Sequence, residues 1–170
     1  MKRIIFLAVL FLLTLGSWQA RAQWSIGGTI GGNHSFKNNT SNINFRPDVS
    51  YSWGSLSAGV SLLVEYYRDY NSSDPASVSL GLSPYVQYYF WEGKVISLLV
   101  EGGLDVYRSI NVSNTFTRLT PYISPGIEIS LSEHWSLVGY VGRLEYDSYS
   151  QTIEFDLGNG GFSAGVYYAF

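Results

Sequence analysis

The sequence predicts an all-β chain that folds as an eight-stranded antiparallel up-and-down transmembrane barrel. Segments in which apolar and small polar residues alternate follow one another, and alternation with period two is typical of strands. Beyond the N-terminus, no stretch approaches the ~20 apolar residues of a membrane helix. Only Lys37 and Lys94 supply lysine after residue 22, so the strands lack the charged exterior of a water-soluble domain.

The N-terminus has the three parts of a cleavable signal peptide. Lys2 and Arg3 precede the apolar run 4–15, and Ala20-Arg21-Ala22 forms an A-x-A cleavage site before Gln23. The alternative is a membrane anchor, but the run is too short to cross ~30 Å of hydrocarbon at 1.5 Å per residue. We therefore expect a signal peptide over residues 1–22 and one barrel domain over residues 23–170.

Charge and composition exclude several classes of function. Removing residues 1–22 takes away three of the 10 basic residues and leaves 13 acidic ones, a net charge of −6. This balance argues against nucleic acid as a partner. The chain has no Cys and only two His, so we expect no disulfide, no lipid-modified cysteine, no metal and no cofactor.

Eight strands can be placed in order from the alternation and the turn residues between them. They are Trp24–Phe36, Asn42–Trp53, Ser55–Tyr70, Ser77–Trp91, Lys94–Arg108, Phe116–Ser132, Trp135–Asp147 and Thr152–Phe170. Their connections alternate between short turns and longer polar loops. Membrane barrels have this asymmetry, with short turns on one side and long loops on the other.

The third and fifth predicted strands show the two faces most clearly. Leu62 and Val64 share an apolar face, whereas Ser61 and Glu65 share a polar one. The five residues 61–65 recur unchanged at 97–101, a period of 36 residues. A repeat of this length indicates a copied supersecondary unit, here a strand–turn–strand hairpin. The apolar faces should contact lipid and the Ser- and Gly-rich faces should line a narrow interior.

Two features suggest local breaks in these strands. Pro47, Pro84 and Pro125 each remove a ladder hydrogen bond inside a predicted strand, and bulges at these positions would accommodate the loss. In the last strand the apolar residues are odd-numbered up to position 157 and even-numbered from Phe162. One extra residue within Gly158–Gly161 would restore the face.

Aromatic residues gather at the two ends of the predicted strands. All tryptophans beyond residue 22 lie beside a short turn or the mature N-terminus: Trp24, Trp53, Trp91 and Trp135. Tyrosines collect near the long loops: Tyr66, Tyr70, Tyr107, Tyr146 and Tyr149. Two aromatic belts separated by aliphatic residues are typical of the two membrane interfaces.

The last strand ends on a hydrophobic pattern in which Phe162, Val166, Tyr168 and Phe170 alternate with small residues and Tyr167. This segment resembles the C-terminal signal strand of bacterial outer-membrane β-barrels, which the barrel-assembly machinery reads. In pattern, length and this signal, the chain resembles the small barrels of the OmpX and OmpA-transmembrane-domain type. The resemblance implies residence in the cell outer membrane, with the tryptophan belt on the periplasmic side.

The inward faces carry an unusual number of charged residues for so narrow a barrel. They are Arg46, Asp48, Glu65, Glu101, Asp105, Arg118, Glu128, Arg143, Glu145, Glu154 and Asp156. An eight-stranded barrel is just wide enough for side chains to fill it, so these charges should pair across the lumen. We expect a network in which Glu65, Glu101 and Glu128 meet Arg46 and Arg143, with Glu145 nearby. We expect this network to be structural, and the alternative is a gated ion path or a proton-sensitive plug.

The two histidines favour an enzyme only weakly. His134-Trp135-Ser136 superficially resembles the His-x-Ser of outer-membrane lipid A deacylases, but it lies at the short-turn end, away from the outer leaflet. His34 lies near the long-loop end with no evident Ser and acid partners, which a catalytic triad requires. A soluble lipocalin-like barrel is a further alternative, and the scarcity of lysine argues against it.

We therefore expect a small outer-membrane barrel that is not an enzyme, has no open pore, and has a structural or surface-interaction role such as membrane integrity or adhesion. The alternatives are an enzyme acting on lipid A and a narrow channel. The expected partners are outer-membrane lipid including lipopolysaccharide, the assembly machinery, and a host or surface ligand at the long loops. We expect a monomer.

Overall fold

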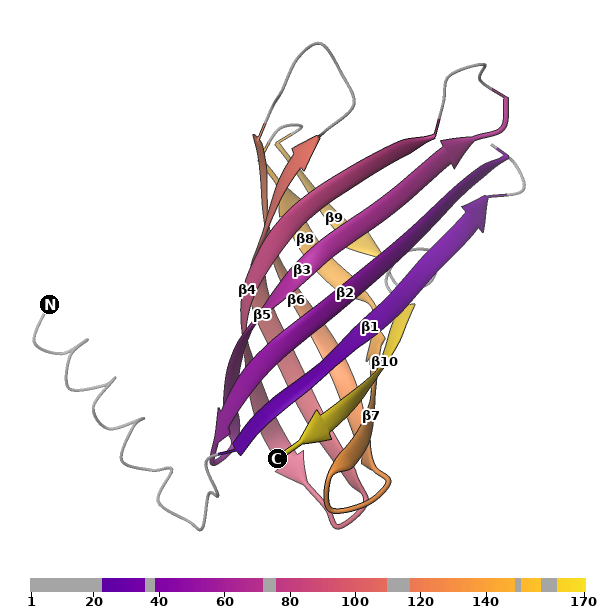
Figure 1. Ribbon diagram of the computed structural model, residues 1–170. Helices are drawn as coiled ribbons and strands as arrows, with labels where there is room; N and C mark the ends of the chain where they lie inside the picture. The colour runs from indigo at the N-terminus through magenta and orange to yellow at the C-terminus, as the bar shows by residue number, and fades with distance from the viewer. Residues whose placement is uncertain (1–22, 36–38, 72–75, 110–116, 149–150, 157–161) are drawn as a thin grey trace, which may run out of the picture.

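The computed structural model describes residues 23–35, 39–71, 76–109, 117–148, 151–156 and 162–170. Ten antiparallel strands cover nearly all of these residues (Figure 1). They are β1 (Gln23–Ser35), β2 (Thr40–Trp53), β3 (Leu56–Asp69), β4 (Ser77–Glu92), β5 (Ile96–Ser109), β6 (Thr117–Ser130), β7 (Trp135–Val141), β8 (Arg143–Asp147), β9 (Thr152–Asp156) and β10 (Phe162–Ala169). No helix in the described part of the chain is long and apolar enough to cross a membrane.

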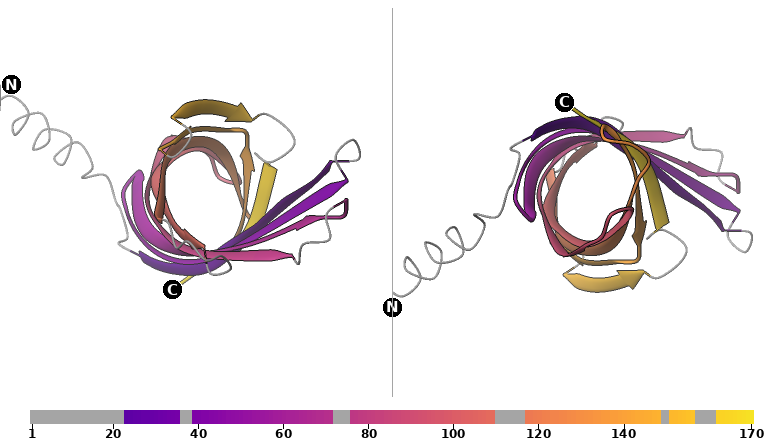
Figure 2. Two further views of the ribbon diagram at one scale, coloured as in Figure 1. Left: turned by 90° about the horizontal axis from the view of Figure 1, so that it is seen from above. Right: turned by 90° about the horizontal axis from the view of Figure 1, so that it is seen from below.

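Eight of the strands close into a ring. Each of β1 to β6 pairs with its neighbour in the chain, β6 pairs with β7, β7 with β10, and β10 with β1. The end-on views show this ring as an oval barrel (Figure 2). Closure leaves these strands without a free edge, as hydrocarbon surroundings require. The predicted eight-stranded antiparallel barrel is confirmed.

The seventh predicted strand is not continuous. It divides at Gly142, whose φ of 84° is in the left-handed region that glycine adopts most readily. The break also changes which positions face inward, because Val138 and Tyr140 are buried in β7 whereas Asp147 is buried in β8. Trp135 and Arg143 are both odd-numbered positions of one predicted strand, yet Trp135 points outward and Arg143 points into the lumen. The backbone at Gly142 causes this change of face.

The eighth predicted strand, Thr152–Phe170, also divides, into β9 and β10. Strand β9 pairs with β8 alone among the described strands, and this short hairpin stands beside the ring (Figure 2). In the same views, the outer ends of β1, β2 and β3 extend away from the barrel axis. The extra residue expected within Gly158–Gly161 lies outside the described residues. Glu154, expected in the lumen, is exposed on β9 instead.

The two faces of the strands are as predicted from the alternation. On β3, Leu62 is 46 % exposed whereas its neighbours Ser61 and Leu63 are 2 % exposed. The same alternation recurs on β6, where Ile123 points outward and Tyr122 is buried. Leucine also enters the lumen at Leu63 and Leu99, the corresponding positions of the 36-residue repeat. Apolar side chains face lipid, and mainly polar ones fill the interior.

Two of the three proline positions show no bulge. The pairing register continues unchanged on both sides of Pro47 and Pro84, so the prediction of bulges there is wrong. At Pro125 the register toward β5 is also unchanged, but on the other side one extra residue lies on the β7–β8 chain between the pairs Gly126–Tyr140 and Ile123–Leu144. A strand can retain its register around a proline because only one ladder hydrogen bond is lost. Another register shift lies between Tyr89 and Trp91. It leaves the adjacent Phe90 and Trp91 both exposed on the outer surface.

Candidate functional site

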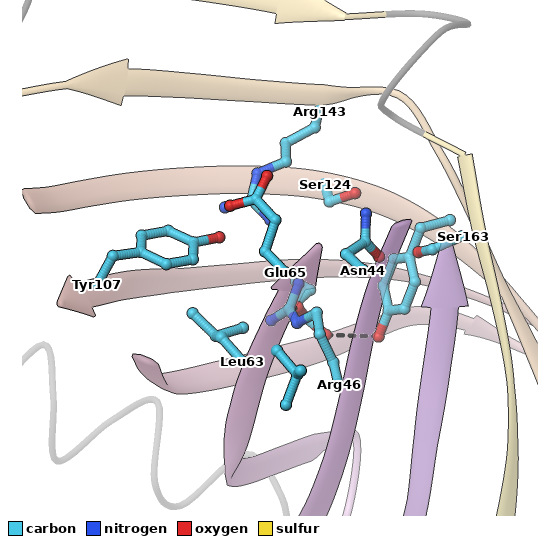
Figure 3. A pocket seen from close by; sticks show the side chains of 11 residues that line it. Asn44, Arg46, Leu63, Glu65, Tyr107, Ser124, Arg143 and Ser163 are labelled. Atoms are coloured by element: carbon cyan, nitrogen blue, oxygen red, sulfur yellow. Dashed lines mark hydrogen bonds and ion pairs between the residues drawn. The ribbon is translucent and has the colours of Figure 1, made fainter. Parts of the chain in front are cut away.

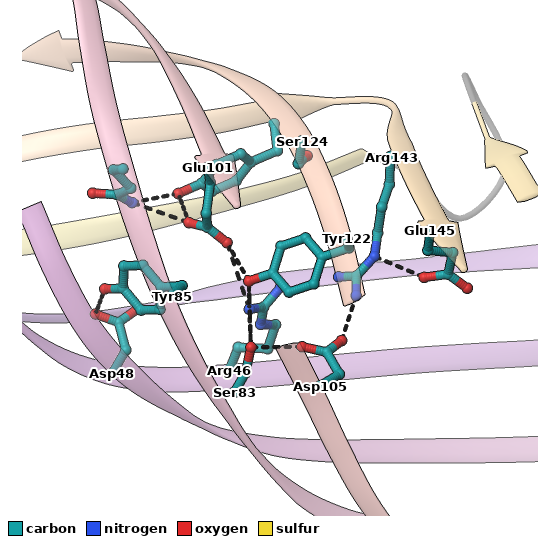
Figure 4. Close-up of polar contacts among 12 residues, drawn as sticks. Arg46, Asp48, Ser83, Tyr85, Glu101, Asp105, Tyr122, Ser124, Arg143 and Glu145 are labelled. Atoms are coloured by element: carbon teal, nitrogen blue, oxygen red, sulfur yellow. Dashed lines mark hydrogen bonds and ion pairs between the residues drawn. The ribbon is translucent and has the colours of Figure 1, made fainter. Parts of the chain in front are cut away.

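A buried carboxylate on β5 lies at the centre of the lumen. Glu101 is 4 % exposed and forms an ion pair of 3.6 Å with Arg46. Three side chains donate hydrogen bonds to its carboxylate oxygens: Gln87 Nε2 (3.0 Å), Tyr122 Oη (2.6 Å) and Tyr140 Oη (2.5 Å). These partners come from β2, β4, β6 and β7, so a single acidic group connects strands on opposite walls (Figure 4).

The Arg46 guanidinium links this centre to the next group of polar residues. Its Nη2 donates to Tyr122 Oη at 2.8 Å and to Ser83 Oγ at 3.2 Å. Ser83 in turn donates to Asp105 at 2.5 Å. Since a guanidinium has five donors in a fixed plane, Arg46 can bond several walls of the barrel at once.

Asp105 is the second buried carboxylate, with 0 % exposure. Besides Ser83, it accepts a hydrogen bond from Tyr107 Oη at 3.3 Å and forms an ion pair with Arg143. Arg143 also donates from Nε to Glu145 at 2.8 Å. Its guanidinium carbon lies 3.8 Å from the centre of the Tyr122 ring, in a cation–π contact. Two acidic residues therefore balance the Arg143 charge.

Asp48 on β2 forms a third polar centre nearer the short turns. Tyr85 donates to its Oδ1 at 3.0 Å, and Tyr167 donates to its Oδ2 at 2.8 Å. Tyr167 lies on β10, 119 residues further along the chain. Both oxygens of the carboxylate are thereby satisfied by tyrosines from two different strands.

Each buried lumen tyrosine lies beside a glycine of the neighbouring strand. Tyr85 is paired with Gly59, and Tyr122 with Gly103. A Cβ added at either glycine would come within 2.6 Å of the tyrosine hydroxyl oxygen. The glycines therefore make room for the rings to lie flat across the strand and to reach the central carboxylates. The same pairing recurs twice more, between Gly126 and Tyr140 and between Gly27 and Tyr167.

The predicted charge network is only partly assembled. Arg46 meets Glu101, as expected, and Arg143 meets Glu145. Glu65 instead accepts a hydrogen bond from Asn42 at 2.7 Å, and Glu128 lies in a separate cavity. Among the described residues neither forms an ion pair with an arginine. Arg143 pairs with Asp105 instead, and Arg46 bonds Tyr122 and Ser83 in addition to its ion pair with Glu101.

Sequence reasoning assigned no role to the buried tyrosines Tyr85, Tyr140 and Tyr167. A signal was present, since each occupies a position on the polar face of its strand. Tyr107 was expected in the outer aromatic belt, but its ring faces the lumen and its hydroxyl donates to Asp105. The prediction for Tyr107 failed because the odd positions of β5 point inward. Tyr149 lies outside the described residues.

Two cavities flank the central polar network. The one toward the long loops has a volume of about 70 Å³ and is bordered by Asn44, Glu65 and Arg143 among others (Figure 3). The one toward the short turns has about 120 Å³ and is bordered by Ser25, Gln87 and Glu128 among others. Glu101 and its partners lie between them. Side chains thus separate these two small chambers of the described lumen.

The tryptophans expected as a belt lie at one end of the barrel and are exposed. They are Trp24 at the start of β1, Trp53 at the end of β2, Trp91 near the end of β4 and Trp135 at the start of β7. Trp24 packs against Tyr51 at 5.1 Å between ring centroids, and Trp135 packs edge-on against Tyr168 at 5.0 Å.

The C-terminal residues that resemble an assembly signal form the closing seam. Phe162, Val166 and Phe170 are exposed on the outer surface of the barrel. The backbone N–H of Phe170 donates to the carbonyl of Trp24 at 3.0 Å, so the last residue is paired with the first described strand. His134, at the same end, lies with Nδ1 2.9 Å from the Ala169 carbonyl oxygen.

Comparisons with known proteins agree with this architecture. A family model described as the outer membrane protein beta-barrel domain matches residues 5–170. Neisserial surface protein A is similar in structure, with a TM-score of 0.59 and 14 % identity over 88 % of this chain and 97 % of that one. The N-terminal β-barrel domain of Pseudomonas aeruginosa OprF has a TM-score of 0.50 and 16 % identity, over 88 % and 100 %. At such identities the likeness shows the fold alone. No curated protein matched the sequence.

Proposed function

Because the chain belongs to the outer membrane protein beta-barrel domain family and resides in the outer membrane, we propose that it is a closed barrel with a structural and surface-interaction role. The observation that carries this proposal is the Glu101 network. Five strands contribute side chains to one compact polar layer in the middle of the lumen, with a cavity on each side. Such a layer holds the walls together and obstructs the passage of ions.

A catalytic role has less support from the geometry. His134 is engaged with a backbone carbonyl at the short-turn end of the barrel. The buried carboxylates are held by tyrosines and arginines within the described barrel, beside cavities of only about 70 and 120 Å³. The interaction surface that we propose is the long-loop end, where the strands extend furthest beyond the ring. Lipopolysaccharide and surface ligands are the partners we propose there.

Conductance in planar bilayers tests the closed lumen directly. We expect negligible steady current from the purified, folded protein. Heat-shifted migration on gels provides the control that the inserted protein is folded. A large and stable single-channel current from the unmodified chain would instead favour the narrow-channel alternative, with the two cavities as parts of its path.

A further inference from the structure

One edge of the short strand β9 has no partner among the described strands. Strand β9 (Thr152–Asp156) pairs antiparallel with β8 along its whole length, and its other edge pairs with no described strand. In an antiparallel pair, half of a strand's backbone N–H and C=O groups point away from the neighbouring strand. The β8–β9 hairpin stands beside the ring (Figure 2), so these groups are not used in closing the barrel. An exposed edge of this kind is a template on which another extended segment can pair.

The side chains of β9 are exposed on both faces of the hairpin. Ile153 is 74 % exposed and Phe155 is 64 % exposed. They lie on one face of the hairpin, with their β8 partners Tyr146 and Leu144. Glu154 lies on the opposite face and is exposed as well. The free edge therefore presents one acidic position between two apolar ones.

The charge of Glu154 is not balanced within the described part of the chain. The register of the hairpin places Glu154 directly opposite Glu145, and like charges at such a pair destabilise it. Glu145 is paired with Arg143 at 2.8 Å and lies 4.0 Å from Arg118, whereas Glu154 forms no ion pair with any described residue. A basic residue on a strand added at the free edge would supply the missing opposite charge.

The same charge argues against a second copy of the chain as the occupant of this edge. Two β9 strands that pair antiparallel about their central residue would set two Glu154 side chains directly against each other. Charged residues on edge strands oppose self-association in this way. A basic segment avoids this repulsion.

We propose that the free edge of β9 binds an extended basic segment of another polypeptide at the cell surface, by strand addition. The segment alternates basic and apolar residues, with Lys or Arg opposite Glu154 and apolar residues opposite Ile153 and Phe155. Backbone hydrogen bonds along the edge provide the affinity, and the alternation provides the selectivity. This inference rests on the surface-interaction role proposed above for the long-loop end, and it names the chemistry of the partner.

A synthetic heptapeptide in which valine alternates with lysine is a suitable probe, and the same peptide with glutamate in place of lysine is its control. Binding is measured by fluorescence anisotropy of the labelled peptides with the folded barrel in phosphatidylcholine nanodiscs, after subtraction of binding to empty discs. We expect the lysine peptide to bind at least about tenfold more tightly than the glutamate peptide. Methylating every backbone nitrogen of the lysine peptide should weaken its binding by a similar factor, because it then donates no hydrogen bond to the edge.

Reversing the charge at position 154 tests which residue selects the peptide. Glu154→Lys should bind the glutamate peptide more tightly than the lysine peptide. Glu133→Lys, at an exposed position of the short-turn end, is the matched control and should keep the preference for lysine. Heat-shifted migration on gels establishes that each variant is folded.

Three results would each overturn the proposal: equal binding of the two peptides to the unmodified protein, binding that backbone methylation does not change, or an unchanged lysine preference in Glu154→Lys. A stable dimer of the unmodified protein, detected by light scattering and unable to bind the lysine peptide, would assign the edge to a second copy and would overturn it as well. Failure here would leave the closed barrel standing, because conductance tests the lumen separately.

Discussion

The middle and the outer part of the lumen both contain acidic and basic side chains, but the partners that bind these charged groups differ between the two regions. In the middle, Glu101 and Asp48 are each held by tyrosine hydroxyls from several strands. In the outer part, Arg118 lies 3.1 Å from Asp147 and 4.0 Å from Glu145 and is 35 % exposed. The middle is a buried layer of hydrogen bonds, whereas the outer part is held by more exposed ion pairs.

The buried side-chain N and O atoms that lack a hydrogen-bond partner also distinguish the middle of the barrel from its outer part. Within the described residues they are Asn42 Oδ1, Arg118 Nε and Thr120 Oγ1, all in the outer half of the barrel. The outer half is also where β1, β2 and β3 fan outward and where the β8–β9 hairpin stands beside the ring (Figure 2). In the middle of the barrel, backbone pairing closes the ring of strands. In that same part, none of the described buried side-chain N and O atoms lacks a hydrogen-bond partner.

The largest loss of stability is expected when Arg46 is removed from the middle of the lumen. Arg46→Ala leaves the Glu101 carboxylate buried without its counter-ion, which typically costs 3–5 kcal/mol. Urea unfolding from lipid vesicles should show a loss of that size in the free energy of unfolding, and planar bilayers should show brief small openings. The double variant Arg46→Met with Glu101→Gln should regain much of the stability, because no buried charge is then left unpaired. A single variant as stable as the unmodified protein would mean that the central layer is not structural.

A glycine substitution tests how the tyrosines are packed. Gly103→Ala places a methyl group against the Tyr122 hydroxyl and should destabilise the barrel by about 1–3 kcal/mol through overpacking. Gly102→Ala is the matched control on the same strand, because its added Cβ would meet only the Tyr122 carbonyl oxygen, at 3.9 Å. Both can be compared by urea unfolding from vesicles. Equal effects of the two substitutions would indicate that the Tyr122 ring does not depend on the space above Gly103.

Sequence patterns predicted the ring of strands, the lipid-facing residues and most lumen positions. Alternation with period two is a local property, so it can be read without knowing which strands are neighbours across the lumen. The partners of Glu65 and Glu128 could not be predicted in this way. Cross-lumen contacts depend on the stagger of strands around the closed ring, which is set by the whole set of registers. The break at Gly142 was missed because a single glycine within a strand pattern is ambiguous.

The smallest effect is expected in the outer part, at Arg118. Its ion pairs with Asp147 and Glu145 are partly exposed, and pairs of this kind are typically worth 0–1 kcal/mol. Arg118→Ala should therefore change the free energy of unfolding by less than about 1 kcal/mol and leave the conductance negligible, since the central layer is untouched. Raising the salt concentration should reduce even this small difference, because solvent screens exposed charges. A loss as large as that of Arg46→Ala would show that the outer ion pairs are as structural as the middle layer, and the distinction between the two regions would then fail.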